Sequence, residues 1–304
     1  MELIGAELKS ETESTVLLKQ FQVSNSSTKS FDYKLEDRRK IWESLYKIIK
    51  HGEADLQYEA LNCARILSRD SNGINEVVSD DLTLTLLRLG HIETGVTSQD
   101  DKVNVESLKV LSNLMHGSRQ VQSYCAQFGF LSKLLDKISS YSSLPSSNDA
   151  KIFDCRLLFL FTALLPEQRN IARHNLDAVN ILLGVLQTVL AAPEMGQEDG
   201  SVVCEVLKVL FNISVNSTQE DTEELRAIAR RCRDLVRMKI ADSETSQKVV
   251  SNVVNVVTNM EGRLEPLHDL LETSELGQPA EQDVTSHGVV VNVLQSFLQL
   301  LRHK

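Results

Sequence analysis

A short pattern that recurs along the chain constrains the fold more than any other feature of the sequence. It sets apolar residues around a small or polar residue and an Asn, as in Val110–Leu114, Leu210–Ile213 and Val256–Met260, with variants at Ile66–Arg69 and Leu160–Leu164. The Asn, or the residue that replaces it, falls at positions 69, 113, 163, 212 and 259, so successive markers are 44 to 50 residues apart. Armadillo and HEAT repeats recur every ~40–47 residues, and the interval found here is close to theirs.

A second pattern repeats in phase with the first. Leu-rich segments precede the markers at Leu82–Leu87, Phe130–Leu135 and Val179–Leu183, and their apolar residues have helical spacing. Polar loop signals separate the segments at residues 70–73, 139–149, 193–200 and 273–288. Each period is therefore expected to hold two or three helices and a loop. Neighbouring periods must share one core, because a single period cannot bury its own apolar face.

These patterns predict an all-α, armadillo/HEAT-like, right-handed superhelical solenoid that forms a single repeat domain over residues 1–304. An aromatic content of only 5% argues against a β-sandwich. The last Leu-rich segment, Val289–Leu301, should be followed by another helix of its repeat, but the sequence ends at Lys304. We therefore expect a last repeat that is truncated at its C-terminal end and lacks the polar cap of a solenoid.

The charge and the cysteines limit the location and the partners. A net charge of −10 disfavours nucleic acid and anionic membranes as partners. No apolar run reaches the ~18 residues of a membrane span, and the N-terminus lacks the apolar core of a signal peptide. The cysteines form no C-x-x-C pair and are predicted to be small buried residues; they are Cys63, Cys125, Cys155, Cys204 and Cys232. A cytoplasmic protein without a transmembrane segment is expected.

The helical face that carries the markers is basic, although the chain is acidic. Residues four positions apart share a helical face, which gives the pairs Arg65/Arg69, Lys109/Asn113, Phe159/Ala163, Lys208/Asn212 and Asn255/Asn259. Four of these five pairs are polar and every charge in them is positive. Such a ladder suits a peptide that is acidic or ends in a carboxylate. Partner-binding roles are predicted for Arg65, Arg69, Lys109, Asn113, Phe159, Lys208, Asn212 and Asn259.

A structural role for the same residues is an open alternative. An Asn at the marker can tie down backbone groups between repeats. The basic residues can pair with nearby Glu106, Glu205 or Asp70, since Glu106 and Glu205 stand three positions before Lys109 and Lys208.

Motifs that accompany covalent chemistry are absent from the sequence. It contains no P-loop, no G-x-G-x-x-G, no H-E-x-x-H and no G-x-S-x-G, and its seven histidines are scattered. We predict no catalytic residues, no cofactor site and no metal site, and therefore a protein that is not an enzyme.

Several segments resemble the synembryn family of armadillo-type proteins. They are Ala64–Asp70, Glu106–Leu114, Phe153–Leu164 and Glu205–Ile213, in the order and spacing of the family. The similarity runs from about Ser30 to the end of the chain, and Phe153–Leu164 is its most specific part.

The resemblance implies a guanine nucleotide exchange factor and folding chaperone for G-protein α subunits (Gα), in their GDP-bound or nucleotide-free form. Family members hold the C-terminal helix of Gα in the concave groove, which opens the nucleotide site and releases GDP. The family's groove residues match Arg65, Arg69 and Asn113 here. The resemblance also implies a role in G protein-coupled receptor signalling, either in the bulk cytoplasm or at the cell cortex.

Two other hypotheses compete with this interpretation. An armadillo-type adaptor would bind an acidic or carboxylate-ended peptide without affecting nucleotide exchange. A hydrolase or transferase would need motifs that the sequence lacks. Because family members are longer than 304 residues, we expect this chain to bind a Gα tail but to release GDP poorly.

Overall fold

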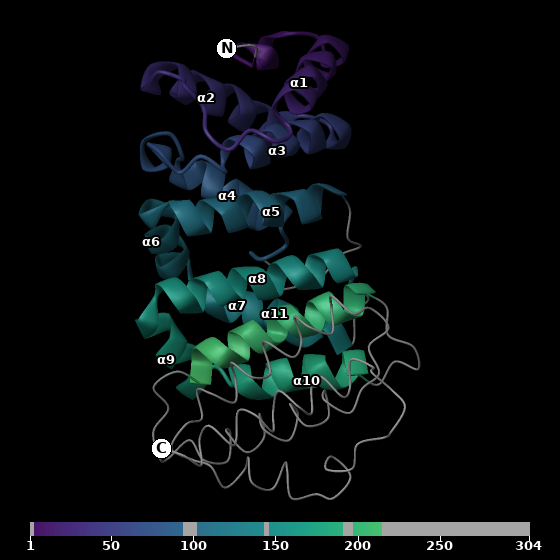
Figure 1. The fold of residues 1–304 in the computed structure, drawn as a ribbon, viewed down its shortest axis with the longest axis vertical. Helices are drawn as coiled ribbons and strands as arrows, with labels where there is room; N and C mark the ends of the chain where they lie inside the picture. Colours follow the sequence, from purple (N-terminus) through teal and green to yellow (C-terminus); the bar gives the residue numbers. More distant parts are fainter. Residues whose placement is uncertain (1–2, 94–101, 143–145, 191–196, 215–304) are drawn as a thin grey trace, which may run out of the picture. The chain divides into compact units, whose positions relative to one another are not determined.

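The computed structural model describes residues 3–93, 102–142, 146–190 and 197–214. These residues belong to two compact units, Met1–Leu164 and Leu165–Lys304. The described residues of both units contain helices and no strand (Figure 1). The prediction of one repeat domain over residues 1–304 stays a prediction.

The first unit contains eight α-helices among its described residues. They are α1 (Glu11–Asn25), α2 (Leu35–His51), α3 (Ala54–Leu67), α4 (Asp80–Leu89), α5 (Lys102–Gly117), α6 (Arg119–Phe128), α7 (Phe130–Ser139) and α8 (Asn148–Leu164). Three short 3-10 helices, η1 (Ala6–Leu8), η2 (Ile74–Glu76) and η3 (Ser140–Ser142), complete it. The second unit begins with α9 (Pro166–His174), α10 (Ala178–Leu190) and α11 (Gln197–Ser214).

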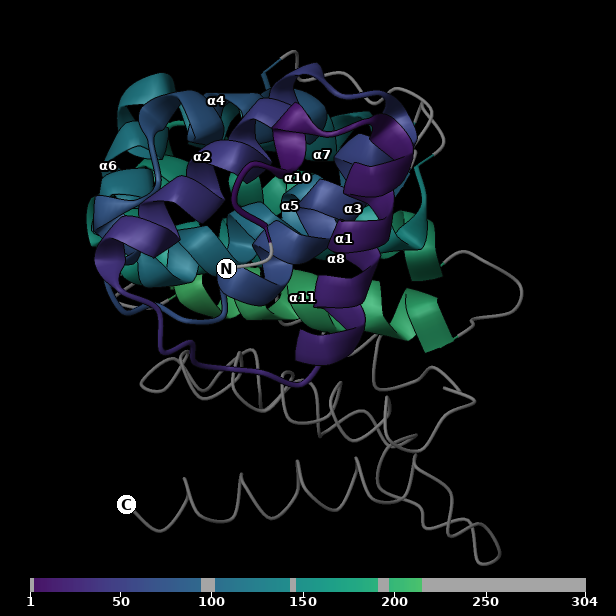
Figure 2. The same cartoon turned by 90° about the horizontal axis from the view of Figure 1, so that it is seen from above.

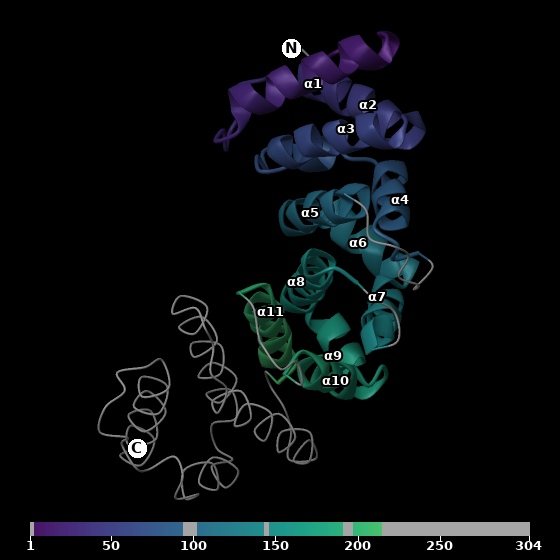
Figure 3. The same ribbon diagram turned by 90° about the vertical axis from the view of Figure 1, so that its right-hand side faces the viewer.

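The helices of the first unit stack in two layers. One layer runs from α1 through α3 and α5 to α8, and α2, α4 and α7 pack behind it, as Figures 1 and 3 both show. Figure 2, which looks down the stack, shows α3 and α5 close to each other in projection. The short helix α6 links α5 of one layer to α7 of the other. Helices α6, α7 and α8 thus form one armadillo-type repeat of three helices.

Local signals set where these helices begin. The Ser79 side chain accepts a hydrogen bond from the Leu82 amide at the start of α4, and Ser118 does the same for Val121 at the start of α6. Both satisfy amide groups that have no partner inside the helix. Gly129 separates α6 from α7 with φ of 75°, a left-handed conformation that glycine adopts without steric cost.

The two sequence patterns fall on different helices in each unit. The Leu-rich segments predicted at residues 82, 130 and 179 lie in α4, α7 and α10, and the markers 113, 163 and 212 lie in α5, α8 and α11. Marker 69 differs from the prediction, since α3 ends at Leu67 and Arg69 stands in the turn that follows. The loop predicted at residues 193–200 is shorter than expected because α11 begins at Gln197. Marker 259 and the segment 289–301 lie outside the described residues.

Helix α5 lies at the centre of the first unit and is buried on most of its circumference. Leu108, Leu111 and Leu114 are fully inaccessible, because α3, α8 and α4 all pack against this helix. A buried ion pair adds to the contact between α7 and α8, with Lys137 Nζ 2.7 Å from Asp154 Oδ2. The same ammonium group donates to the Gly90 carbonyl at 2.9 Å. Helices α4, α7 and α8 are thereby joined through one side chain.

Candidate functional site

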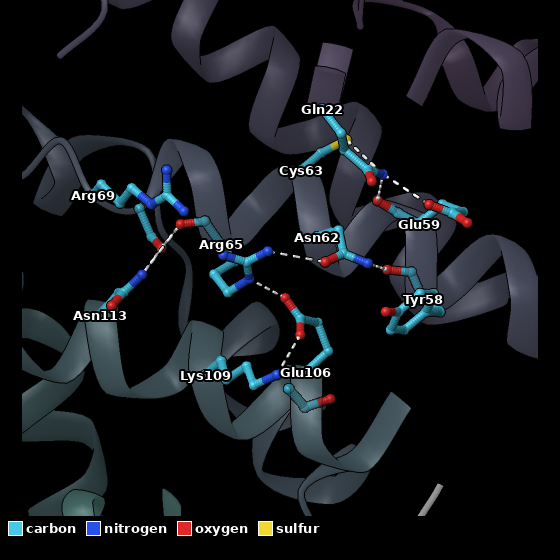
Figure 4. A network of polar contacts seen from close by, with 12 residues as sticks. Gln22, Tyr58, Glu59, Asn62, Cys63, Arg65, Arg69, Glu106, Lys109 and Asn113 are labelled. Carbon is cyan, nitrogen blue, oxygen red and sulfur yellow. Dashed lines mark hydrogen bonds and ion pairs between the residues drawn. The ribbon is translucent and has the colours of Figure 1, made fainter. Parts of the chain in front are cut away.

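Helices α3, α5 and α8 place a row of polar and basic side chains along one layer of the first unit. We call this row the ladder face and define it by Arg65, Lys109, Asn113, Phe153 and Arg156. Figure 4 shows the part that α3 and α5 contribute. Arg65, Lys109, Asn113 and Arg156 are all half-buried, so each of these residues is partly accessible to solvent.

Glu106 of α5 lies at the centre of the ladder face. Its side chain is only 3% exposed, and it forms ion pairs with two cations. Arg65 donates from Nε to Glu106 Oε1, and Lys109 Nζ lies 3.2 Å from Oε2 (Figure 4). Arg65 also donates from Nη2 to Asn62 Oδ1 at 3.1 Å. The guanidinium of Arg65 is therefore oriented by Asn62 of its own helix and by Glu106 of α5.

Asn113 performs the structural role that the sequence left open. Its Nδ2 donates to the Arg65 carbonyl at 3.2 Å and to Ser68 Oγ at 3.0 Å (Figure 4). Both acceptors belong to the last turn of α3 and its C-cap, where carbonyl groups lack partners inside the helix. The marker Asn of α5 therefore binds the end of α3 to the next repeat.

Arg69 is exposed and has a different environment from Arg65. Its Nη1 donates to the Ser26 carbonyl at 2.6 Å, in the segment that follows α1. The next residue, Asp70, is buried and pairs with Arg38 of α2 at 3.6 Å. Asp70 is thus engaged by α2 rather than by Arg69, and the Arg69 guanidinium points away from the core.

Phe153 connects α5 to α8 on the ladder face. Lys109 Nζ lies 5.5 Å from the ring centroid, and the Arg156 guanidinium carbon lies 5.0 Å from it. Cations attracted to an aromatic face hold their position while they keep contact with water. Phe159 and Ala163 follow on α8, where Phe159 is half-buried and Ala163 is exposed.

The sequence-based prediction omitted Arg156, and it named Glu106 only as one possible partner of the basic residues. A signal was present: one cation stands in each repeat, at Arg65, Lys109, Arg156 and Lys208. The Asn-based pattern indicated Phe159 and Ala163 in α8. Arg156, three positions before Phe159, is the basic residue of this repeat.

The described part of the second unit repeats the arrangement seen at Glu106. In α11, Glu205 is buried and lies 3.0 Å from Lys208 Nζ. Asn212, four positions after Lys208, is also buried, at 7% exposure. Asn259, the last predicted partner residue, lies outside the described residues.

The ladder face can donate hydrogen bonds to anionic groups.

Within the described ranges, no three His, Cys, Asp or Glu side chains gather where a metal could bind. Burial raises the pKa of the Cys63 and Cys125 thiols to about 12, so both stay protonated at neutral pH and are poor nucleophiles. None of the helices in the described part is long and apolar enough to cross a membrane.

Comparisons with solved structures support the armadillo fold. A designed armadillo repeat protein superposes with a TM-score of 0.57 at 12% identity, covering 85% of this chain and 98% of the design. An engineered protein superposes with a TM-score of 0.60 at 17% identity, covering 84% of this chain and 97% of the other. The predicted armadillo/HEAT-like all-α class is confirmed.

A family model described as "Guanine nucleotide exchange factor synembryn" matches residues 60–304. The chain belongs to the synembryn family. The resemblance predicted from Ala64–Asp70 onward is therefore confirmed, and all residues that define the ladder face lie inside the matched range.

Curated relatives of this synembryn carry the name of chaperone. "Chaperone Ric-8A" of Xenopus tropicalis is 28% identical in an alignment of 293 positions that covers 86% of this chain and 53% of the relative. "Chaperone Ric-8B" of Rattus norvegicus is 26% identical and covers 80% of this chain and 52% of the relative. "Chaperone Ric-8" of Drosophila melanogaster is 26% identical, covering 81% and 48%. The chain spans about half the length of these relatives.

The family assignment corrects one prediction. The absence of catalytic motifs led to the expectation that the chain is not an enzyme, and that expectation is wrong. The synembryn family is described as a guanine nucleotide exchange factor, a class of protein that acts on G proteins. The motifs that the sequence lacks accompany covalent chemistry. Nucleotide exchange requires no covalent step, so their absence says nothing about exchange activity.

Proposed function

We propose that this synembryn is a guanine nucleotide exchange factor and folding chaperone for Gα. The observation that carries the proposal is the family match over residues 60–304, together with the names of the curated relatives. A second support is the ladder face, which lies in the matched range and offers ordered cations to an acidic or carboxylate-ended partner.

In the proposed mechanism, the ladder face takes the C-terminal helix of Gα. Arg65 and Arg69 stand near the end of α3 and supply planar guanidinium groups, which can donate two parallel hydrogen bonds to one carboxylate. Lys109, Asn113 and Phe159 contact the helix further along. Holding the helix away from the rest of Gα opens the nucleotide site, and GDP leaves.

The order already present in the ladder face favours binding. Glu106 and Asn62 hold the Arg65 side chain in one orientation before a partner arrives, so less side-chain entropy is lost on binding. In the second unit, considered by itself, Lys208, Asn212 and Asn259 are proposed as partner-binding residues because they continue the same repeat pattern in the sequence.

GDP release from purified Gα tests the exchange activity. We expect a higher release rate with the chain present than with Gα alone, and a rate that saturates with the concentration of the chain. Binding without any acceleration of release would contradict exchange and favour an armadillo-type adaptor. Because the chain spans half of its relatives, the measured rate also reports whether these 304 residues are sufficient.

Folding of newly made Gα tests the chaperone activity. Cell-free synthesis of Gα with and without the chain, scored by nucleotide binding of the product, should give more active Gα when the chain is present. Equal yields would contradict the chaperone role.

We infer that these activities take place in the cytoplasm or at the cell cortex, where the chain would meet Gα subunits. Fractionation of cells that express the tagged chain tests the location.

A further inference from the structure

Glu106 is a buried carboxylate inside a cluster of cations. It contacts Arg65 and Lys109 directly, and Lys109 shares the Phe153 ring with Arg156. Three cations therefore converge around one carboxylate and one aromatic ring. These groups come from three consecutive helices of one layer, so the cluster exists only in the folded stack.

The charge of this cluster depends strongly on Glu106. With the carboxylate ionised, three positive charges and one negative charge leave an excess of two. Without it the excess would be three, around one carboxylate position and one aromatic ring. A larger cluster of uncompensated cations attracts any polyanion, including nucleic acid, through non-specific electrostatics.

Glu106 leaves donors of its cations available. Arg65 uses Nε toward Glu106 and Nη2 toward Asn62, and a guanidinium has five N–H donors. Arg65 and Lys109 are each 29% exposed, whereas Glu106 is 3% exposed. An incoming anion therefore contacts the cations at the surface, and the buried carboxylate repels the anion without contacting it.

We infer that Glu106 determines the specificity of the ladder face: it restricts the face to partners that present an isolated carboxylate and excludes polyanions. Like charges oppose each other at short range, so the carboxylate reduces the attraction for each further anionic group that approaches. One terminal carboxylate binds between the exposed cations and gains charge-assisted hydrogen bonds. A chain of closely spaced anions gains less from each further contact than it would without Glu106, because the excess is two positive charges instead of three.

The same device recurs in the second unit, considered by itself. Glu205 of α11 is buried and pairs with Lys208, just as Glu106 pairs with Lys109. In both pairs the Lys stands three positions after the Glu. A buried carboxylate beneath an exposed cation is therefore a repeated feature of these helices. The inference uses the proposed function only in treating the ladder face as the partner site.

The test compares Glu106→Gln with Glu36→Gln in the full chain. Gln keeps the shape of Glu and removes its charge, and Glu36 is an exposed residue of α2 that pairs with Lys40 away from the ladder face. The probe is poly-L-glutamate, and its dissociation constant is measured at two salt concentrations. We expect Glu106→Gln to bind the probe at least about tenfold more tightly than the wild type, with a steeper salt dependence, while Glu36→Gln changes by less than about twofold.

Two further variants keep the test decisive. Arg65→Gln in the Glu106→Gln background restores the net charge of the cluster and should return the affinity for poly-L-glutamate to the wild-type level. Glu205→Gln repeats the experiment at the second site if Glu106→Gln loses its helical circular dichroism signal. Equal gains for Glu106→Gln and Glu36→Gln, or no gain from any folded variant, would overturn the inference. No G protein enters this assay, so a chain that fails to release GDP from Gα can still pass it.

Discussion

At the scale of single residues, Arg65 of α3 and Arg69 in the turn after α3 differ in how tightly the chain holds them. Arg65 is fixed between Glu106 and Asn62, whereas Arg69 is exposed and donates to the backbone carbonyl of Ser26. Arg65 is therefore ordered in advance, and Arg69 can reorient toward a partner. The proposed site combines both kinds of cation.

Replacing both arginines with alanine should weaken binding of a peptide with the Gα C-terminal sequence by at least about tenfold, because each provides charge-assisted hydrogen bonds to a carboxylate. Isothermal titration calorimetry measures the effect. Arg39→Ala, which removes an exposed arginine of α2, is the matched control and should leave the affinity unchanged. Unaltered binding by the double variant would contradict the assignment of the site.

The cysteines offer a second test at this scale. Burial raises the pKa of Cys63 and Cys125 to about 12, so at pH 8 their thiols should react with an alkylating reagent far more slowly in the native chain than in denaturant. The sign for stability follows from the same shift. Because the folded pKa lies above the unfolded value near 9, stability from these thiols is present below pH 9 and is lost as the pH rises toward 12. Mass spectrometry after timed labelling measures the reactivity, and rapid modification of the native thiols would contradict their burial.

At the scale of elements, single side chains join neighbouring helices. Asn113 connects α5 to the end of α3, and Lys137 connects α7 to both α4 and α8. Such contacts matter in a stack because each repeat is stabilised mainly by its neighbours. The strength of the two junctions can be measured separately.

Asn113→Ala should lower the free energy of unfolding by about 1–2 kcal/mol, because the Arg65 carbonyl and Ser68 Oγ lose a donor at the end of α3. Urea denaturation followed by circular dichroism measures the change. Asn180→Ala, on the exposed side of α10, is a control that should cost less. If Asn113→Ala weakens peptide binding without changing stability, Asn113 acts on the partner and not on the junction.

Lys137→Met should destabilise the chain more, by about 3–5 kcal/mol, because it leaves the Asp154 carboxylate buried without its cation. The double change Lys137→Met with Asp154→Leu removes both charges and should recover much of the loss. Denaturant midpoints of the two variants provide the comparison. A double variant as unstable as the single one would show that the ion pair is not the source of the effect.

At the scale of the whole molecule, the described residues of both units are helical and armadillo-like. The far-UV circular dichroism spectrum of the full chain should therefore be dominated by helix. Substantial strand content would contradict the extension of the armadillo pattern to residues 215–304, which the sequence markers predict. The spectrum of a chain ending at residue 214 is the natural comparison.

Local spacing in the sequence indicated that the Leu-rich and marker segments are helical, and in which order they follow one another. The Leu-rich segments of α4, α7 and α10 and the markers in α5, α8 and α11 were predictable because apolar periodicity along a helix reflects burial on one face, whatever lies opposite. The family could also be predicted, since runs such as Phe153–Leu164 are sequence features in their own right. The positions of Arg65, Lys109 and Asn113 on one layer follow from the same period.

Only the tertiary structure decided what these side chains contact. Arg65 and Glu106 lie 41 positions apart in the sequence and form an ion pair, whereas the sequence could only name Glu106 as one of several acceptors within reach. It also left Asn113 between two roles and missed the pairing of Arg156 with Phe153. The physical reason is that helical periodicity fixes which way a residue faces, whereas its partner depends on how two helices from different repeats are aligned in the stack.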